Sequence, residues 1–571
     1  MIRAWLRYSL VLVALSIMTG CAGAPKPDST SPPSQGGGNN PPPPPPPTAS
    51  LSVSPTSIQT GQSATLSWTT TQATNVSING IGTVQPNGSQ SVSPSASTTY
   101  NLTARGAGGT LEVTAQLTVM PSPHPTMVNH IIFLAEENRG FDHYFGKLND
   151  YRSAAPFNLS REVSGLPDDC SSANSDWTVP CSAMNKSPDK NGVPTTPIYA
   201  FRLKTACIEG LSPDWIAAHW DFNAFDPTSN TPAMDGFLVS AASAALANGE
   251  NDTAGIRAMG FYTGDDLPYH YWLATQFATS DAWFNPAPAR TQPNRYYMMG
   301  ATSGGYTYPL SGSEPLIQSK TIFDLLQAAG VSWKIYTQLA SGYTYANAFA
   351  GFAGRYASTG NIVIDPTFSQ FIADAQSGNL PAVAFLEKPD ADEKPEATNN
   401  IQDGVNETRD LINAVMYGPS WKDSVFIFTF DEGGGLYDHV PPPTNVPSPD
   451  GIPPVDICTT ATDSRCALAA LTHIPPPYDP PGDFTRYGYR VPLVVISPFT
   501  KPHYVSHVTT DYTAWLKFVE KRFNLEPLTA RDGWSNTSDM SDFFDYQNSP
   551  WATPPANPPS DAGGACYVGL P

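Results

Sequence analysis

The stretch Val425-Phe426-Ile427-Phe428-Thr429-Phe430-Asp431-Glu432-Gly433-Gly434-Gly435 decides the fold of this chain. Its first six residues are apolar, aromatic or β-branched, which is typical of a buried strand, and two acids followed by three glycines end the run abruptly. A second apolar run, residues 130–134, ends in the same way at Ala135-Glu136-Glu137-Asn138-Arg139. The two runs therefore predict two buried strands with acidic groups at their carboxyl ends.

The rest of the carboxyl-terminal 450 residues repeats this alternation of strands and helices. Because strands that alternate with helices form a sheet covered by helices, the pattern predicts an α/β fold with a mostly parallel sheet. Ligands of such sheets bind outside the carboxyl ends of the strands. The further predicted strands are 331–336, 383–386 and 493–496, and the predicted helices are 322–329, 368–375, 407–416 and 514–523.

The acidic strand ends suggest a cation site. Carboxylates and amide oxygens are hard ligands that suit a divalent cation, and the glycines after Glu432 allow the backbone to approach that cation or its substrate closely. Acidic residues at strand ends are also common surface features, so either cluster alone fits a structural role as well.

Four blocks of sequence resemble one known family. They are Glu137-Asn138-Arg139-Gly140-Phe141-Asp142-His143-Tyr144-Phe145-Gly146, Thr291-Gln292-Pro293-Asn294-Arg295, residues 431–440 and residues 490–498. They are similar, in order, to signature blocks of the phosphoesterase family, which includes non-specific phospholipases C and certain acid phosphatases. The family belongs to the alkaline-phosphatase-like superfamily, so the resemblance implies a central mixed, mostly parallel sheet flanked by helices.

The resemblance also implies a metal site and a nucleophile. Glu137, Asn138, Asp431 and Glu432 would hold a divalent metal ion of unknown identity, and Thr291 would be both ligand and nucleophile. A threonine hydroxyl is a poor nucleophile until a cation lowers its pKa, and the same cation can neutralise charge on the phosphoryl oxygens. Thr291 would then carry the phosphoryl group until water removes it. Without the resemblance to the family, Thr291 would be interpreted as an ordinary loop residue.

Protonation of the leaving group needs an acid. His439 matches a family position and is the first choice as general acid or phosphate donor, with a structural histidine as the alternative. Arg295 is predicted to contact phosphate, and a helix cap or a carboxylate pair is the alternative. His219 and His507 are weaker candidates that fit structural roles better.

The sequence departs from the family pattern at four positions. Gly140 stands where the family has serine, and Gly433, Lys394 and Tyr512 stand where it has histidines. The proposed ligands and nucleophile are all kept. The departures therefore concern the chemistry of the leaving group and the substrate more than the metal site.

The charge of the chain limits its partners. A net charge of −20 argues against nucleic acid, because little positive charge is available to neutralise a phosphate backbone. A single phosphate group can still bind if a metal ion supplies local positive charge. The predicted substrate is a phosphate ester, either a soluble phosphomonoester or a phospholipid headgroup.

The amino-terminal residues predict export. Residues 1–21 combine a basic start, a short apolar run and Met18-Thr19-Gly20-Cys21, which resembles the cleavage site of a bacterial lipoprotein signal peptide. The mature protein would then be held at a membrane only through a lipid on Cys21, whereas ordinary cleavage would release it to the periplasm or the medium. Residues 22–47 are a proline-rich linker that cannot form a core.

Residues 48–121 predict a small domain of a different kind. Short β-rich runs broken by glycine and proline surround Trp68, the expected core anchor. The stretch resembles bacterial immunoglobulin-like modules and lacks a cluster of titratable residues, so a spacer or weak adhesive role is expected. Residues 122–571 would form the catalytic domain.

The cysteine count fits an oxidising compartment. Beside Cys21 there are six cysteines, an even number that can pair. Cys170 with Cys181 and Cys458 with Cys466 are expected to form local bridges, while zinc binding is the alternative without supporting spacing. The remaining two are Cys207 and Cys566.

The function that these features favour is metal-dependent hydrolysis of a phosphate ester, of the acid phosphatase or phospholipase C type. Another ester hydrolase of the same superfamily, such as a sulfatase, is the second interpretation, although no sulfatase-type motif surrounds Thr291. A non-catalytic cell-surface binding protein is the third.

Overall fold

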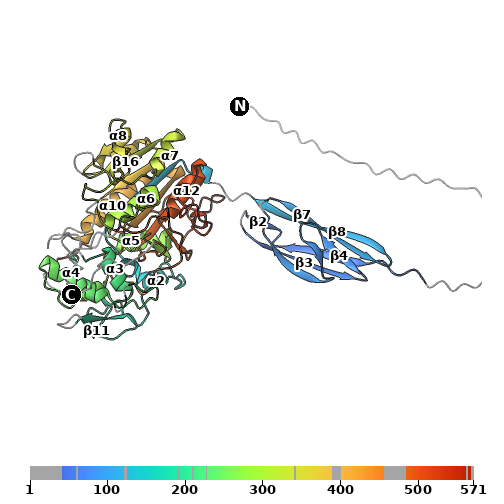
Figure 1. Cartoon of the computed structure of the whole chain (residues 1–571), viewed down its shortest axis with the longest axis horizontal. Helices are drawn as coiled ribbons and strands as arrows, with labels where there is room; N and C mark the ends of the chain where they lie inside the picture. Colours follow the sequence, from blue (N-terminus) through green and yellow to red (C-terminus); the bar gives the residue numbers. More distant parts are fainter. Residues whose placement is uncertain are drawn as a thin grey trace, which may run out of the picture. The chain divides into compact units, whose positions relative to one another are not determined.

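The computed structural model separates the chain into two compact units, Met1–Met120 and Pro121–Pro571. Figure 1 shows both, and each is described by itself. The structure describes residues 42–59, 62–94, 96–120, 125–188, 193–208, 211–224, 226, 228–339, 343–388, 400–455, 484–560 and 563–566. The predicted signal peptide with Cys21, most of the linker, Lys394, Cys458 and Cys466 lie outside these residues.

The amino-terminal unit is built from two antiparallel sheets in its described part. One sheet has the strand order β1-β3-β6, and the other β2-β8-β7-β4-β5, in which only the β2–β8 pair is parallel. Trp68 on β3 is buried, as are Leu66, Leu102 and Leu117. The immunoglobulin-like assignment of this β unit stays a prediction. The strands are β1 Thr48–Ser54, β2 Ser57–Gln59, β3 Ala64–Thr71, β4 Asn75–Ile78, β5 Gly82–Val84, β6 Gly88–Val92, β7 Thr98–Gly106 and β8 Gly109–Met120.

An eight-stranded mixed sheet forms the centre of the larger unit. Its order is β17-β16-β18-β9-β19-β20-β14-β21. Neighbours from β17 to β19 are parallel, β20 is antiparallel to both of its neighbours, and β14 and β21 are again parallel. This arrangement confirms the predicted α/β fold with a mixed, mostly parallel sheet. The strands are β9 His130–Glu136, β14 Ala278–Ser280, β16 Trp333–Thr337, β17 Ile362–Ile364, β18 Val383–Glu387, β19 Ser424–Phe430, β20 Leu493–Ile496 and β21 Tyr504–Ser506.

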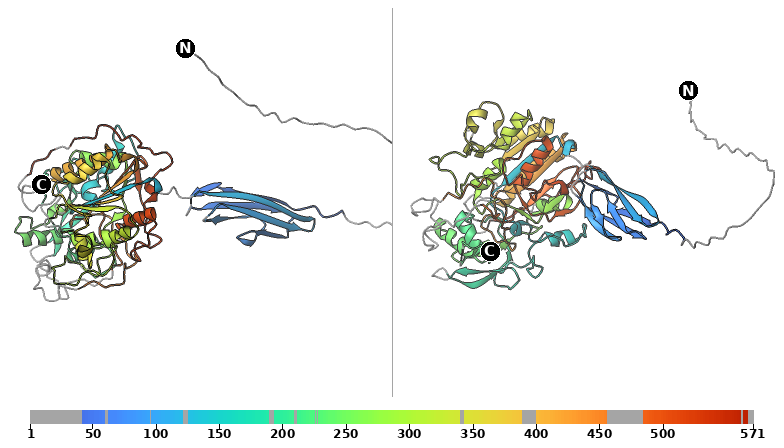
Figure 2. Two further views of the ribbon diagram at one scale, coloured as in Figure 1. Left: turned by 90° about the horizontal axis from the view of Figure 1, so that it is seen from above. Right: turned by 45° about the vertical axis from the view of Figure 1, so that its right-hand side comes forward.

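Helices cover both faces of this sheet (Figure 2). On one face, α10 (Ile401–Met416) contacts α9 (Ser369–Ser377) and α5 (Pro268–Gln276). On the other face, α6 contacts α7 and α12. The covered faces explain why β9 and β19 are apolar along nearly their whole length rather than alternating. The three helices of the second face are α6 Thr291–Gly300, α7 Ile322–Ala328 and α12 Thr513–Phe523.

Smaller elements build the rim beside the carboxyl ends of the central strands. The short helix α1 follows β9 directly, and α3 packs against α4, which contacts the β10–β11 hairpin. Among the described residues, no helix is long and apolar enough to cross a bilayer. The bounds are α1 Phe141–Phe145, α2 Leu148–Ser153, β10 Met184–Pro188, β11 Pro194–Tyr199, β12 Phe201–Arg202, α3 Trp215–Phe222, α4 Phe237–Asn248, β13 Gly260–Phe261, β15 Trp283–Phe284, α8 Phe352–Tyr356 and β22 Thr510–Asp511.

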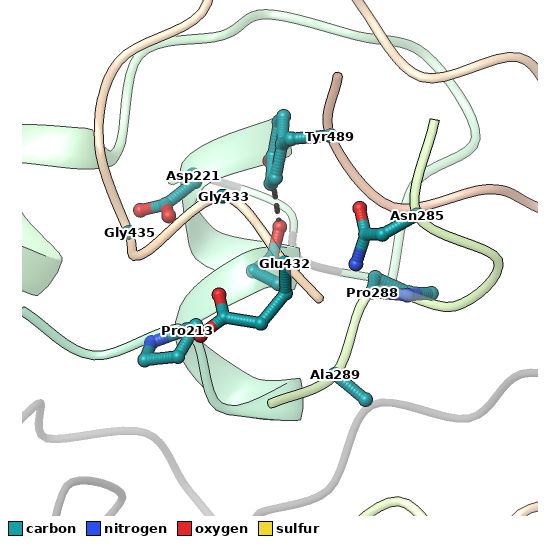
Figure 3. Close-up of a pocket in the computed structure, with 10 residues that line it drawn as sticks. Pro213, Asp221, Asn285, Pro288, Ala289, Glu432, Gly433, Gly435 and Tyr489 are labelled. Carbon is teal, nitrogen blue, oxygen red and sulfur yellow. Dashed lines mark hydrogen bonds between the residues drawn. The ribbon is translucent and has the colours of Figure 1, made fainter. Parts of the chain in front are cut away.

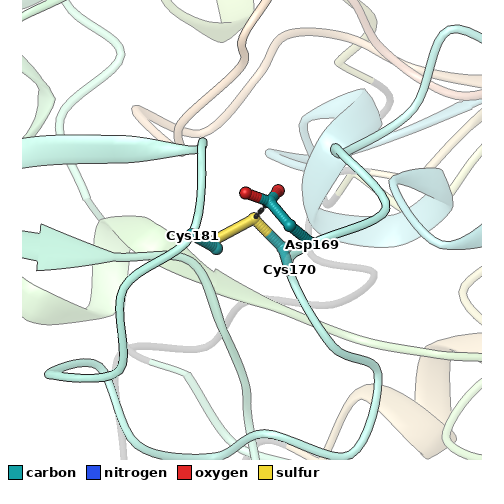
Figure 4. A group of neighbouring side chains, drawn as sticks. All are labelled: Asp169, Cys170 and Cys181. Atoms are coloured by element: carbon teal, nitrogen blue, oxygen red, sulfur yellow. Dashed lines mark hydrogen bonds between the residues drawn. A yellow bond between two sulfur atoms is a disulfide. The ribbon is translucent and has the colours of Figure 1, made fainter.

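Two disulfides join described residues of the larger unit. Cys170 and Cys181 are bonded, as predicted from their spacing, and Figure 4 shows the bridge beside Asp169. Because both sulfurs are bonded to each other, this group offers no thiolate to a metal. The second disulfide joins Cys207 to Cys566, which are 359 positions apart in sequence.

Candidate active site at the carboxyl ends of two central strands

The register of β9 and β19 brings the two acidic clusters together. The strands are parallel neighbours, and Glu136 lies opposite Phe430 at their ends. The backbone N–H of Asp431 donates to the carbonyl of Glu136 at 2.8 Å, which extends the pairing by one residue. Glu137 and Asn138 therefore leave the sheet beside Asp431 and Glu432.

Backbone contacts hold the loop that follows β9 against the loop that follows β19. Asn138 has a left-handed backbone (φ 67°), which asparagine tolerates better than most residues, and its N–H donates to Oδ1 of Asp431 at 3.2 Å. Gly434 donates its N–H to Oε2 of Glu432 at 2.7 Å. A Cβ at Gly434 would lie 2.4 Å from the Asn138 carbonyl oxygen, so the close approach of the loops requires glycine there.

Arg295 contacts the carboxylate of Asp431. Its side chain is fully buried, and Nε donates to Oδ2 of Asp431 at 3.0 Å while Nη2 donates to the carbonyls of Ala135 and Lys388. Burial raises the pKa of Asp431, and the charge of Arg295 partly offsets that rise. The structure thus gives Arg295 a carboxylate partner, which was one of its predicted alternatives.

Thr291 is the first residue of α6 and is half-buried. The sequence alone suggested an ordinary loop, but the helix begins here because proline at its third position is compatible with a first turn. Asn294 anchors the loop before Thr291, since its side chain accepts from the N–H of Ala287 at 3.2 Å and donates to the carbonyl of Ala289 at 2.5 Å. The unsatisfied N–H groups of a helix start favour anions, which suits a phosphoryl group.

His439 lies in a second buried network of charged side chains, which does not include Arg295 or Asp431. Its Nδ1 and its backbone N–H both contact Oδ2 of Asp142, at 2.6 and 2.8 Å. Arg490, fully buried, bonds Asp142 at 3.0 Å and Asp438 at 2.8 Å. Asp142, Asp438 and His439 are close enough to share a metal ion, but the Arg490 guanidinium already lies between the two carboxylates.

The network shifts the titration of its members. Burial alone would lower the pKa of His439 and is the largest effect, but the charge and hydrogen bond of Asp142 outweigh it and raise that pKa. Burial raises the pKa of Asp438 to about 6 against the opposing charge of Arg490. A quarter of the His439 side chain is exposed. An imidazole oriented by a carboxylate and partly open to solvent can act as an acid.

The other two histidine candidates have contacts typical of structural residues. His219 is buried in α3, where its Nδ1 contacts the carbonyl of Trp215 at 2.6 Å, and burial keeps its pKa well below the usual value. His507 contacts Asp281 at 2.9 Å. Tyr512, at one of the positions where the family has histidine, is buried and donates its hydroxyl to the carbonyl of Phe430.

Sequence reasoning missed two residues of this region. Asp142 and Arg490 were quoted within the family blocks without a role, and their place inside two separate matching blocks was the available signal.

Two neighbouring parallel strands of this α/β sheet thus end in acidic side chains, and α6 contacts them through Arg295. The phosphoesterase family matches residues 128–526, more than half of the chain, and the chain belongs to this family. The resemblance stated from the sequence is thereby confirmed, and with it the predicted class of phosphoric ester hydrolases.

Curated relatives agree with this assignment. Phospholipase C B of Mycobacterium tuberculosis is 29% identical over 467 residues, which cover 75% of this chain and 80% of the relative. Non-specific phospholipase C4 of Arabidopsis thaliana is 29% identical over 438 residues, covering 72% and 71%. A solved alkaline phosphatase superfamily protein from Vibrio parahaemolyticus has 10% identity and a TM-score of 0.27 over 48% of this chain and 64% of that one.

Proposed function

We propose that this protein is an exported, metal-dependent hydrolase of phosphate esters that acts through a phosphothreonine at Thr291. The observation that supports the proposal is the pairing of Glu136 with Phe430, because it brings the loops that carry Glu137, Asn138, Asp431 and Glu432 side by side at one edge of the sheet. Asn294 anchors the loop that leads into Thr291.

The side chains at the strand ends fit a divalent cation. Glu137, Asn138, Asp431 and Glu432 supply carboxylate and amide oxygens only, which is the donor set of a hard cation, and Thr291 adds a hydroxyl. When bound, the cation would lower the pKa of the threonine hydroxyl and offset phosphoryl charge.

Thr291, His439 and Arg295 have different roles in the proposed reaction. The Thr291 hydroxyl loses its proton to solvent and its oxygen attacks phosphorus, so that an O–P bond forms on Thr291 while the bond to the leaving oxygen breaks. His439 gives the leaving oxygen a proton. Water then gives a proton to His439 and attacks phosphorus, the Thr291 O–P bond breaks, Thr291 regains a proton, and phosphate or a phosphomonoester is released. Arg295 acts through Asp431, which it orients and whose charge it balances, and a direct contact of Arg295 with phosphate stays a prediction.

Two kinds of phosphate ester remain as substrates. The relatives are named phospholipases C, which favours a phospholipid headgroup. The net charge of −20 favours soluble phosphomonoesters, because an acidic protein is repelled by anionic lipid surfaces. We propose the soluble esters as the better substrates, with the protein exported and either held by a lipid on Cys21 or released.

The test is release of p-nitrophenol from its phosphate, sulfate and phosphorylcholine esters, with and without a chelator. The expected result is turnover of phosphate esters that chelation abolishes and an added divalent ion restores. Thr291→Ala should lower turnover at least ~10³-fold, the scale of other nucleophile removals, and should abolish the phosphorylated protein seen by mass spectrometry after acid quenching. Thr359→Ala, in the turn after α8, is the matched control. Activity of Thr291→Ala within tenfold of the wild type would exclude Thr291 as the nucleophile.

A further inference from the structure

Arg290 directly precedes Thr291, the proposed nucleophile. It is the N-cap residue of α6, and the side chain of Asn294 donates to its carbonyl at 3.3 Å and to that of Ala289 at 2.5 Å. The backbone that carries the Arg290 side chain is therefore held at the start of the helix. The side chain itself is 42% exposed, so its guanidinium is accessible to a substrate that reaches Thr291.

The guanidinium of Arg290 pairs with Asp214, the N-cap residue of α3, at 3.3 Å. The residues that precede the two partners in the chain, Ala289 and Pro213, line a narrow recess together with Glu432 (Figure 3). Figure 3 shows the Glu432 side chain extending toward Pro213. The recess has room for only about one water molecule and seats no part of a substrate. It does show that the Arg290–Asp214 ion pair lies beside the strand-end site.

Two of the proposed metal ligands interact electrostatically with Arg290. The charge of Asp214 is the largest of the effects that raise the pKa of Arg290, and burial opposes them. The charges of Glu432 and Glu137 add to the rise. The guanidinium thus lies within electrostatic range of both ligands and adjoins the nucleophile in the chain.

Three other cations near the strand ends are enclosed by the protein. Arg295 and Arg490 are fully buried and bonded to carboxylates. The Lys388 side chain is only 2% exposed and pairs with Glu136 at 2.9 Å. Of these four cations, Arg290 alone has a side chain open to solvent.

We propose that Arg290 binds the nonbridging oxygens of the substrate's phosphoryl group and thereby selects phosphate monoesters over diesters. This inference rests on the proposed function, because it places the phosphorus atom at Thr291. A guanidinium offers two parallel N–H groups to two oxygens of a phosphoryl group, and such charge-assisted pairs are strong. A monoester presents one more unsubstituted oxygen than a diester, so it gains more from this contact.

The charges at the strand ends favour the same selection. Glu137, Asp431 and Glu432 bring three negative charges, which Arg295 and a divalent cation would together balance. A monoester dianion then adds two further negative charges, whereas a diester adds one. A positive charge at Arg290 therefore stabilises the bound monoester more than the bound diester.

Asp214 is a partner that the guanidinium can exchange. Its other carboxylate oxygen, Oδ2, accepts from the Ser212 hydroxyl at 3.0 Å, so the acid keeps a contact within its own loop. An ion pair in which one side chain is this exposed is weak in water. A phosphoryl group at Thr291 can therefore replace Asp214 as the partner of Arg290.

The experiment compares two esters with the same leaving group, p-nitrophenyl phosphate and bis(p-nitrophenyl) phosphate, on the full chain at saturating divalent metal. The pH is kept above about 7, where the monoester is a dianion because the second pKa of such a phosphate is about 6. Arg290→Gln should lower kcat/KM for the monoester about 10- to 100-fold, the scale of a lost charged hydrogen bond, and change the diester less than about threefold. Arg290→Lys keeps the charge without the planar fork, so it should recover part of the loss.

Two further variants separate a substrate contact from a structural role. Asp214→Asn removes the ion pair but keeps the guanidinium and an N-cap side chain, so the monoester should be turned over as before. Arg355→Gln is the matched control, because Arg355 on α8 is 43% exposed and pairs with Asp324 at 2.9 Å. It should leave both esters unchanged. An equal or larger loss on the diester in Arg290→Gln, or the same loss in Asp214→Asn, would assign Arg290 a structural role, and no loss would also overturn the proposal.

A binding measurement separates failure of this contact from failure of the proposed function. Inorganic phosphate is titrated calorimetrically into Thr291→Ala and into the double variant that also carries Arg290→Gln, both at saturating metal. Binding that is weaker by about tenfold or more in the double variant would support the contact even if no ester were hydrolysed. Equal binding by the two proteins, or binding by neither, would overturn the contact even if hydrolysis at Thr291 were confirmed.

Discussion

Replacing Asp142 with asparagine tests whether His439 is the acid of the reaction. Asp142 accepts from both the imidazole and the backbone N–H of His439, and its other oxygen pairs with Arg490. It is therefore the group that raises the pKa of His439 against the effect of burial. In Asp142→Asn the charge is lost while the amide oxygen can still accept one hydrogen bond.

The size of the effect follows from these contacts. A hydrogen bond to a charged group contributes about 1.5–3 kcal/mol. Because this contact favours the protonated imidazole, its loss should lower the pKa of His439. Arg490 keeps Asp438 at 2.8 Å and the carbonyl of Ser164 at 2.7 Å, so the loss of stability should be only about 1–3 kcal/mol.

The assay is the pH dependence of kcat/KM for p-nitrophenyl phosphate and propyl phosphate. A general acid must be protonated, so activity falls as the pH rises through its pKa. A lower pKa moves this alkaline limb to lower pH, and more clearly for the alkyl ester, whose leaving group needs the proton more. His507→Gln, which removes an exposed histidine also paired with an aspartate, is the control and should leave the limb in place. An unmoved limb in a folded Asp142→Asn protein would refute the role of His439.

Three further predictions concern the metal, the cysteines and the substrate. Asp431→Asn and Glu137→Gln should each weaken metal binding and lower the rate, because each removes an anionic oxygen; full activity of dialysed protein that elemental analysis finds free of metal would contradict the site. Mass mapping without reductant should find Cys207 joined to Cys566 and no readily alkylated thiol among the six cysteines beyond Cys21; two alkylated thiols would contradict full pairing. Soluble p-nitrophenyl phosphate should be turned over with a higher kcat/KM than phosphatidylcholine in vesicles at matched metal and pH, and a clear preference for the lipid would favour a phospholipase C.

Those parts of the fold that depend on apolar periodicity could be predicted from sequence. The strands β9, β18, β19 and β20 and the helices α7, α9 and α12 lie within two residues or so of their expected bounds, because both faces of the sheet are buried and the apolar runs are uninterrupted. The helix α10 begins at Ile401, six residues before the expected start, since Asn400 caps it by accepting from the N–H of Gln402. The short antiparallel strands and the strands of the rim have too few residues for a periodic apolar pattern to be recognised in the sequence.

The candidate site was predictable only where a motif preserved it. Thr291 and the four proposed ligands were found through the family blocks, and the strand register explains why two distant blocks meet. The partners of Arg295 and His439 depend on side chains far away in sequence, such as Asp431 and Asp142, so spacing could not identify them.

The bond between Cys207 and Cys566 has a consequence for how the protein withstands cleavage. It encloses α3, α6 and β19 within one covalent ring. Hydrogen bonds from Ala206 to Ala565 and from Asn400 to Gly564 join the same two segments. A protease that cuts any one surface loop inside this ring leaves both pieces attached. A nicked molecule is therefore expected to keep its strand-end site assembled until a reductant opens the ring and the pieces separate.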